Sequence, residues 1–195
     1  GRIRARMVKG ALEKVVDILM LVDAHKGAER RGKGFPYIVH PMEVAAIVST
    51  MTNDEDILSA AVLHDTVEDA GATVQEIYDF FGPRVADLVS SETENKRPEL
   101  PKSETWITRK METVEHLREC KDPGIKMIAL ADKLSNLRAT YQQYCLIGDS
   151  VWNRFNMKDK ALHQRYFEEV LQTMPEFQKY PVYKEYEWYL EHLFG

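Results

Sequence analysis

Four ionisable residues, His64, Asp65, Glu68 and Asp69, directly follow the apolar run at residues 60–63. In one continuous helix, which advances about 100° per residue, their side chains would lie within an arc of roughly 140°. Buried carboxylates need a partner, and a divalent cation is an economical one. The cluster therefore indicates a metal-dependent site. A chance His-Asp pair beside solvated acidic residues at a helix end would produce the same pattern.

Two other positions offer the same kinds of ligand. His40 precedes Pro41, and proline suits the first turn of a helix, so His40 is expected at a helix start. Asp132 lies within the apolar stretch 128–134, where an unpaired carboxylate would be costly. With His64 and Asp65, these residues would form a mixed nitrogen and oxygen site suited to manganese, iron, zinc or magnesium. The alternative for Asp132 is a salt bridge to a neighbouring lysine or arginine.

The elements that must position these residues are predicted to be helices. Apolar residues recur at helical spacing and no useful strand alternation is present, so the sequence predicts an all-α fold with a bundle-like core. The expected helices cover residues 12–22, 41–51, 54–69, 73–80, 83–91, 104–119 and 123–137, followed by two closing helices near 162–170 and 186–193. The run 92–103 is the longest expected loop and could act as a lid.

Composition narrows the class of protein further. The length of 195 residues favours a single domain over residues 1–195. The net charge of −5 argues against non-specific nucleic-acid binding, and the absence of a long apolar run argues against a membrane span. Cys120 and Cys145 are too few for a disulfide framework, so we expect ordinary buried thiols in a cytoplasmic protein. Nothing in the composition indicates the oligomeric state.

Several segments together resemble a known family. FPYIVHP at residues 35–41, AAVLHDTVEDA at 60–70, FG at 81–82 and ALADKLSNLRA at 129–139 occur in this order. The chain resembles the hydrolase domain of the RelA/SpoT alarmone enzymes, and most of all the small alarmone hydrolases of the Mesh1 type. The resemblance extends from about residue 25 to residue 141 and implies an all-helical HD-domain bundle.

The resemblance also implies an activity and a set of site residues. The implied reaction is metal-dependent hydrolysis of the 3′-pyrophosphate of ppGpp or pppGpp, a small-molecule nucleotide, to GDP or GTP and pyrophosphate. The implied cofactor is Mn²⁺, with other divalent metals possible. The implied metal ligands are His40, His64, Asp65 and Asp132, and the residues that place and activate the attacking water are Glu68 and Asp69.

The same resemblance suggests where the nucleotide binds. Arg30 and Arg31 match the family's base-binding segment, in which a guanidinium stacks on the purine. Asn136 matches a ribose-contacting asparagine, and Lys102 would present its charge to the leaving pyrophosphate. Without the resemblance, the arginines would be read as solvated and Asn136 as a helix-to-helix hydrogen bond. Ala28, where glutamine is common, leaves the purine preference open.

Other functions remain open from the residues alone. The same site could act on an adenosine alarmone such as (p)ppApp, or on the 2′-phosphate of NADPH. A non-catalytic nucleotide-binding module is a further alternative, although clustered carboxylates are costly to retain without a catalytic use. The length leaves no room for a synthetase domain, so we expect hydrolysis alone.

Overall fold

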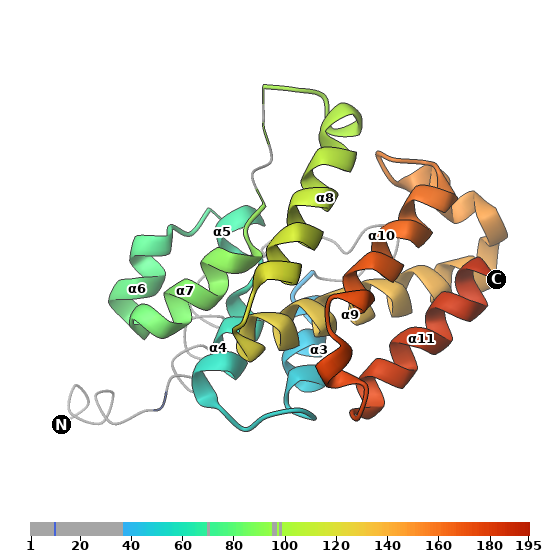
Figure 1. Cartoon of the computed structure of the whole chain (residues 1–195). Coiled ribbons are helices and arrows are strands. Elements are labelled where there is room, and N and C mark those ends of the chain that lie inside the picture. The colour runs from blue at the N-terminus through green and yellow to red at the C-terminus, as the bar shows by residue number, and fades with distance from the viewer. Residues whose placement is uncertain (1–9, 11–36, 70, 95–96, 98) are drawn as a thin grey trace. The chain divides into compact units, whose positions relative to one another are not determined.

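The computed structural model describes residues 10, 37–69, 71–94, 97 and 99–195 (Figure 1). Within these residues every regular element is helical and no strand occurs, so the expected all-α class is confirmed. The expected helix at 12–22, together with Arg30 and Arg31, lies outside the described residues. The chain divides into two compact units, Gly1–Thr93 and Glu94–Gly195, which are described in turn. A single domain over residues 1–195 stays a prediction.

The first unit is built around α4, which packs against both α3 and α7, while α6 packs against α7. Its helices are α3 (Val39–Val48), α4 (Glu55–Leu63), α5 (Thr66–Asp69), α6 (Val74–Phe81) and α7 (Pro83–Glu92). Val44, Ala60 and Leu88 contribute fully buried side chains to its core, one from each of α3, α4 and α7. The packing of these buried apolar faces fixes the positions of the helix starts and turns, which carry the polar residues.

The expected starts of α4, α6 and α7 are confirmed, and each has a local cause. Asp54 accepts hydrogen bonds from the backbone N–H groups of Asp56 (2.9 Å) and Ile57 (3.2 Å), which caps α4. Thr73 and Glu76 form a reciprocal capping box at the start of α6. Gly82 separates α6 from α7, and its φ of 88° is one that residues with a side chain rarely adopt.

The prediction of one continuous helix over 54–69 is wrong, because the helix is interrupted between Leu63 and Thr66. The Thr66 hydroxyl donates to the carbonyl oxygen of Leu63 (2.6 Å), and His64 donates its Nδ1–H to that of Ala61 (2.7 Å). These side chains compete with backbone N–H groups for helical carbonyls. Asp65 therefore lies in a turn, and the single arc predicted for the four ionisable residues does not exist.

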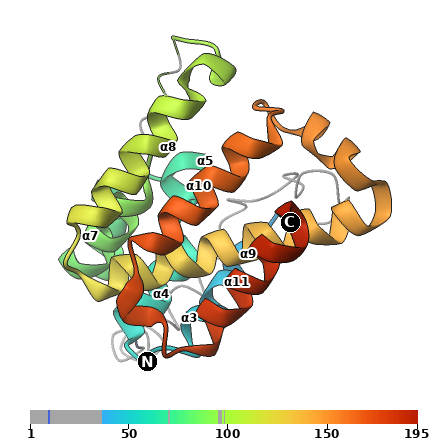
Figure 2. The same cartoon turned by 45° about the vertical axis from the view of Figure 1, so that its right-hand side comes forward.

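The second unit is organised on the long helix α9, against which α10 and α11 pack, with α8 packing on α10 (Figure 2). Its helices are α8 (Lys102–Glu119), α9 (Pro123–Ile147), α10 (Lys160–Gln172) and α11 (Pro181–Phe194), with 3-10 turns at η1 (Gly148–Arg154) and η2 (Pro175–Phe177). The expected cap at Asp122 is confirmed, since its side chain accepts from the N–H of Gly124 (2.8 Å). The two expected closing helices are also confirmed.

The expected loop over 92–103 is shorter than predicted at its C-terminal end. Lys102 and Ser103 belong to the first turn of α8, and the N–H groups of Glu104 (3.0 Å) and Thr105 (3.2 Å) donate to the carbonyl oxygen of Pro101. Proline immediately before a first turn loses no intrahelical hydrogen bond, so the helix can begin directly after Pro101.

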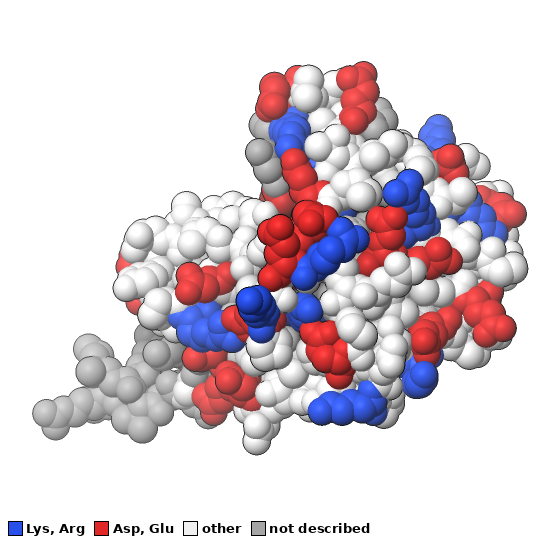
Figure 3. Space-filling model, in the orientation of Figure 1, with Lys and Arg blue, Asp and Glu red and all other residues white. Residues whose placement is uncertain are grey.

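The two cysteines are both free, but the expectation that they are buried is wrong. Cys120 is half-buried and Cys145 is exposed. Cys145 lies in the last part of α9, where every residue from 141 to 147 is exposed or half-buried. No helix of the described chain combines the length and apolar character needed to cross a membrane. On the face shown in Figure 3, acidic and basic side chains are mixed with one another and are not separated by sign.

Candidate metal centre

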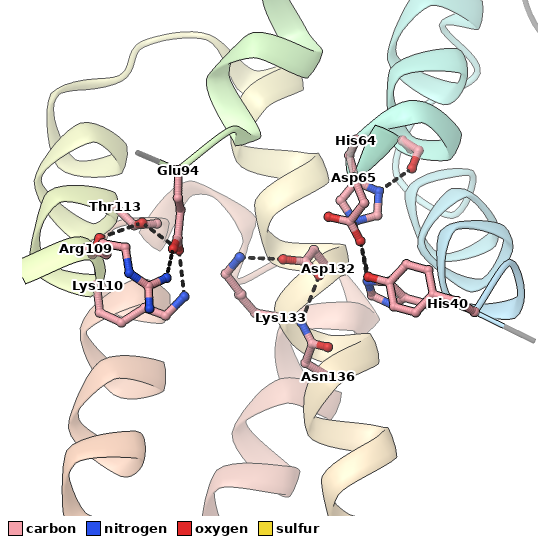
Figure 4. Close-up of polar contacts among 12 residues, drawn as sticks. His40, His64, Asp65, Glu94, Arg109, Lys110, Thr113, Asp132, Lys133 and Asn136 are labelled. Atoms are coloured by element: carbon pink, nitrogen blue, oxygen red, sulfur yellow. Dashed lines mark hydrogen bonds and ion pairs between the residues drawn. The ribbon is translucent and has the colours of Figure 1, made fainter. Parts of the chain in front are cut away.

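The first unit brings three of the predicted ligands together. His40, His64 and Asp65 each offer one ligand atom, and these atoms all lie within 4.8 Å of one another. Asp65 Oδ2 is 3.5 Å from His40 Nε2 and 3.3 Å from His64 Nε2 (Figure 4). The first turn of α3 supplies His40, the end of α4 supplies His64, and the turn that follows supplies Asp65. Helix packing and one turn thus create the cluster.

Burial differs among the three side chains. His40 and His64 are 2% and 1% exposed, and their rings meet edge to face with centroids 5.2 Å apart. The Asp65 side chain is 19% exposed. The two imidazoles are therefore held by the core of the first unit, whereas the carboxylate stands at its edge. Such an arrangement gives a solute access to the carboxylate while the nitrogen atoms stay fixed.

The tautomer of His64 follows from its hydrogen bond. A carbonyl oxygen only accepts, so the bond from Nδ1 to the Ala61 oxygen places the proton on Nδ1. In the neutral ring Nε2 then carries a lone pair, and it faces the lone pairs of Asp65 Oδ2 at 3.3 Å. Two such atoms repel unless a cation or a proton lies between them. Two imidazole nitrogens and one carboxylate oxygen therefore fit a divalent metal.

Tyr37 also belongs to this cluster, and the sequence analysis missed it. Its hydroxyl donates a hydrogen bond to Asp65 Oδ2, the oxygen that both histidines approach. Its ring meets the ring of His40 edge to face, with centroids 5.5 Å apart. The only signal in the sequence was its place in FPYIVHP, three residues before His40.

Glu68 and Asp69 follow the cluster on the short helix α5. Glu68 is half-buried, and Asp69 is the last residue of the helix. They follow a turn and do not lie on the same helix as His64. The common helix face that the sequence predicts for these residues is therefore not formed. Their proposed catalytic role stays a prediction.

In the second unit, Asp132 is a buried carboxylate with partners of its own. Lys133 Nζ donates to Asp132 Oδ2, and Asn136 Nδ2 donates to Asp132 Oδ1 at 2.8 Å (Figure 4). The salt bridge considered for Asp132 is thus present. The hydrogen bond considered for Asn136 joins two residues of α9, not two helices. The roles of Asp132 as a metal ligand and of Asn136 as a ribose contact stay predictions.

A second charged cluster in this unit was not predicted. Glu94 accepts from Arg109 Nη1 at 2.7 Å, from Lys110 Nζ at 2.6 Å and from the Thr113 hydroxyl at 3.3 Å. Burial by itself raises the pKa of Glu94, but the neighbouring cations, Lys110 first among them, hold that pKa below its usual value. The sequence predicts a loop at Glu94, and its partners lie 15 to 19 residues later in the chain, on α8.

The remaining predicted contacts are placed only in part. Lys102 is the first residue of α8, so it lies at a helix start and not in the expected loop over 92–103. Arg30 and Arg31 are outside the described residues. The proposed nucleotide contacts of all three stay predictions.

Comparisons with known proteins find relatives that are named as a pyrophosphohydrolase and as a pyrophosphokinase. It is 45% identical over 120 residues to the mouse guanosine-3′,5′-bis(diphosphate) 3′-pyrophosphohydrolase MESH1, covering 59% of this chain and 63% of that protein. It is 39% identical over 117 residues to the GTP pyrophosphokinase rsh of Brucella ovis, covering 57% of this chain and 15% of that protein. The chain thus spans less than two thirds of the length of these curated relatives.

Solved structures agree with this relationship. A Listeria monocytogenes protein is 34% identical with a TM-score of 0.69, covering 80% of this chain and 98% of that one. A metazoan SpoT orthologue that hydrolyses ppGpp is 27% identical with a TM-score of 0.66, covering 93% of each chain. The model of the HD domain family matches residues 19–147, a span that contains His40, His64, Asp65 and Asp132. Since this match covers more than half of the sequence, the chain belongs to the HD domain family.

Proposed function

We propose that this chain is a divalent-metal-dependent hydrolase that removes pyrophosphate from the 3′ position of guanosine alarmones. The observation that carries the proposal is the convergence of His40, His64 and Asp65 in a chain of the HD domain family. The named activity of the mouse relative supports the choice of substrate, as does that of an Aquifex aeolicus relative of the same name that is 34% identical over 115 residues.

His40, His64 and Asp65 would hold the metal, with Asp132 as the fourth ligand. The support for Asp132 is its buried carboxylate and its place in the ALADKLSNLRA segment. We propose Mn²⁺ as the metal, because the family resemblance implies it and a mixed imidazole and carboxylate set is compatible with it, as it is with other divalent metals. When bound, a divalent metal would offset the negative charge on the oxygens of the attacked phosphoryl group and lower the pKa of a nearby water.

Glu68 and Asp69 would act on the water. A carboxylate on the short helix that follows the ligands can orient a water molecule and accept its proton. A bond then forms between the water oxygen and the phosphorus attached to the ribose O3′, and the bond from that phosphorus to O3′ breaks. O3′ leaves with a proton, so the products are GDP or GTP and pyrophosphate.

The nucleotide would be held by residues on both sides of the reacting bond. Arg30 and Arg31 would stack on the base and approach its phosphates, because a planar guanidinium suits both tasks. Asn136, one turn beyond Asp132 on α9, would contact the ribose. Lys102 would face the leaving pyrophosphate.

Product analysis tests this proposal. The protein is stripped of metal with a chelator, reloaded with Mn²⁺, and incubated separately with guanosine 3′-pyrophosphates, adenosine 3′-pyrophosphates and NADPH. We expect pyrophosphate from the guanosine compounds, loss of turnover in the chelator and recovery with Mn²⁺. Release of orthophosphate from NADPH alone would identify a different substrate. Full turnover after chelation would contradict metal dependence.

A further inference from the structure

We propose that Tyr37 is a positioning residue that sets the orientation of the Asp65 carboxylate for metal binding. This inference rests on the metal site of the proposed function. All of the groups that carry it belong to the first unit: the Tyr37 hydroxyl, the Asp65 carboxylate and the two histidine rings. The role would lie in holding a ligand, since nothing in the geometry requires Tyr37 to touch the substrate.

The hydroxyl bonds to the oxygen on which the cluster converges. Tyr37 donates to Asp65 Oδ2, and both histidine Nε2 atoms lie within 3.5 Å of this same oxygen. Fixing one oxygen of a carboxylate also fixes the plane of the group, and therefore the direction of its second oxygen. One hydrogen bond can thus set the orientation of the whole ligand.

Asp65 needs such a constraint more than the histidines do. His40 and His64 are almost completely buried, and a hydrogen bond to Ala61 also fixes the His64 ring. The Asp65 side chain is the most exposed of the three, and its backbone lies in the turn between α4 and α5. A partly exposed side chain on a turn retains rotamer freedom that an ordered ligand must lose. The hydroxyl of Tyr37 removes part of that freedom before metal binds.

Tyr37 is itself well placed for this task. Its carbonyl oxygen accepts from the N–H of His40 at 2.9 Å, which ties it to the first turn of α3. Its ring packs edge to face on His40. Tyr37 therefore connects the start of α3, which carries one ligand, to the turn that carries another, 28 residues later. Groups that orient metal ligands in this way typically change metal affinity about 10- to 100-fold when removed.

The test is the affinity of the full chain for Mn²⁺, measured by the electron paramagnetic resonance signal of free Mn²⁺ during titration of metal-free protein. Tyr37→Phe removes the hydroxyl and keeps the ring on His40. We expect the dissociation constant to rise about 10- to 100-fold. The matched control is Tyr78→Phe, which removes the hydroxyl of an exposed tyrosine on α6 in the same unit and should leave the affinity unchanged.

A second measurement separates positioning from general damage. Turnover of Tyr37→Phe should recover toward the wild-type value at saturating Mn²⁺, and its melting temperature without metal should stay close to that of Tyr78→Phe. A distorted core would lower the melting temperature and would not be rescued by metal. In that case, or if Tyr37→Phe binds Mn²⁺ as tightly as wild type or more tightly, the positioning role is wrong. If wild type binds no Mn²⁺, the proposed metal site itself fails.

Discussion

Asp65 in the first unit and Glu94 in the second are both partly buried carboxylates, but their neighbours differ in kind. Asp65 is approached by two imidazoles and a phenol, none of which brings a fixed positive charge. Glu94 accepts hydrogen bonds from Arg109 and Lys110, which do. The described contacts of Glu94 therefore include two cations, whereas those of Asp65 include two imidazole nitrogens, which can themselves serve as metal ligands.

Asp132 stands between these two cases. It is as buried as a core residue, and its partners include one ammonium, from Lys133, and one amide, from Asn136. Burial of a carboxylate therefore does not by itself identify a metal ligand. The charge of the neighbouring groups distinguishes a structural ion pair from a site that requires an added cation.

The sharpest test of the comparison removes a ligand from the first unit. His64→Ala deletes the Nε2 atom that faces Asp65 Oδ2, and we expect more than a roughly 100-fold loss of Mn²⁺ affinity, because a direct ligand matters more than a group that only orients one. Turnover should fall with the metal content. Elemental analysis after dialysis measures the loss, and a variant with unchanged metal would show that the cluster is not a metal site.

Glu68→Gln and Asp69→Asn should separate metal binding from chemistry. Each variant should keep its Mn²⁺ and its KM but lose about 10²-fold or more in kcat, the usual range for a positioned acid or base. Steady-state kinetics and metal analysis on the same preparations give both quantities. Loss of metal instead would mean that a ligand has been mistaken for a catalytic group.

Glu94→Gln should affect stability and not metal binding. The change leaves Arg109 and Lys110 without their carboxylate, and breaking these partly buried ion pairs should cost about 2 kcal/mol in free energy of unfolding, between the values for exposed and for fully buried pairs. Urea unfolding measures this loss. The exposed pair of Arg97 and Glu112 supplies the control, since Glu112→Gln should change stability very little. Equal effects of the two variants would contradict the structural role of Glu94.

The same variant has a predicted pH signature. The pKa of Glu94 is lower in the folded chain than the usual value, so its contribution to stability is complete above the pKa of an unfolded glutamate. It is lost as pH falls through the lower, folded pKa. The stability gap between wild type and Glu94→Gln should therefore be full near pH 7 and should narrow in acid, below about pH 4.

Two buried tyrosines of the second unit test whether a partner compensates for the burial of a polar group, and the expected effects are the smallest. Tyr186 donates to the carbonyl oxygen of Phe167 at 3.0 Å, whereas the Tyr166 hydroxyl is buried without a hydrogen-bond partner among the described residues. Tyr186→Phe should cost about 1 kcal/mol, and Tyr166→Phe should cost nothing or stabilise, because it removes a desolvated group. Thermal unfolding compares them. A larger loss in Tyr166→Phe would reveal a partner for its hydroxyl.

Much of the fold, and the residue types that meet in the cluster of His40, His64 and Asp65, could be predicted because the determining interactions are local. The caps at Asp54, Thr73 and Asp122 act within three residues of themselves, so they predicted helix starts that the structure confirms. The ligand types of His40, His64 and Asp65 were evident for the same reason. The break after Leu63 was missed although it too is local, because the Thr66 hydroxyl can bond a carbonyl in either a helix or a turn.

The sequence by itself thus determined the helical class, the capped helix starts and the kinds of ligand that the chain offers. Tertiary structure alone decided which side chains meet. Tyr37 reaches Asp65 across 28 residues, and Glu94 meets Arg109 across 15, through helix packing that no local pattern encodes. The physical reason is that capping and periodicity depend on neighbours within one or two turns, whereas charge compensation depends on which buried faces come together.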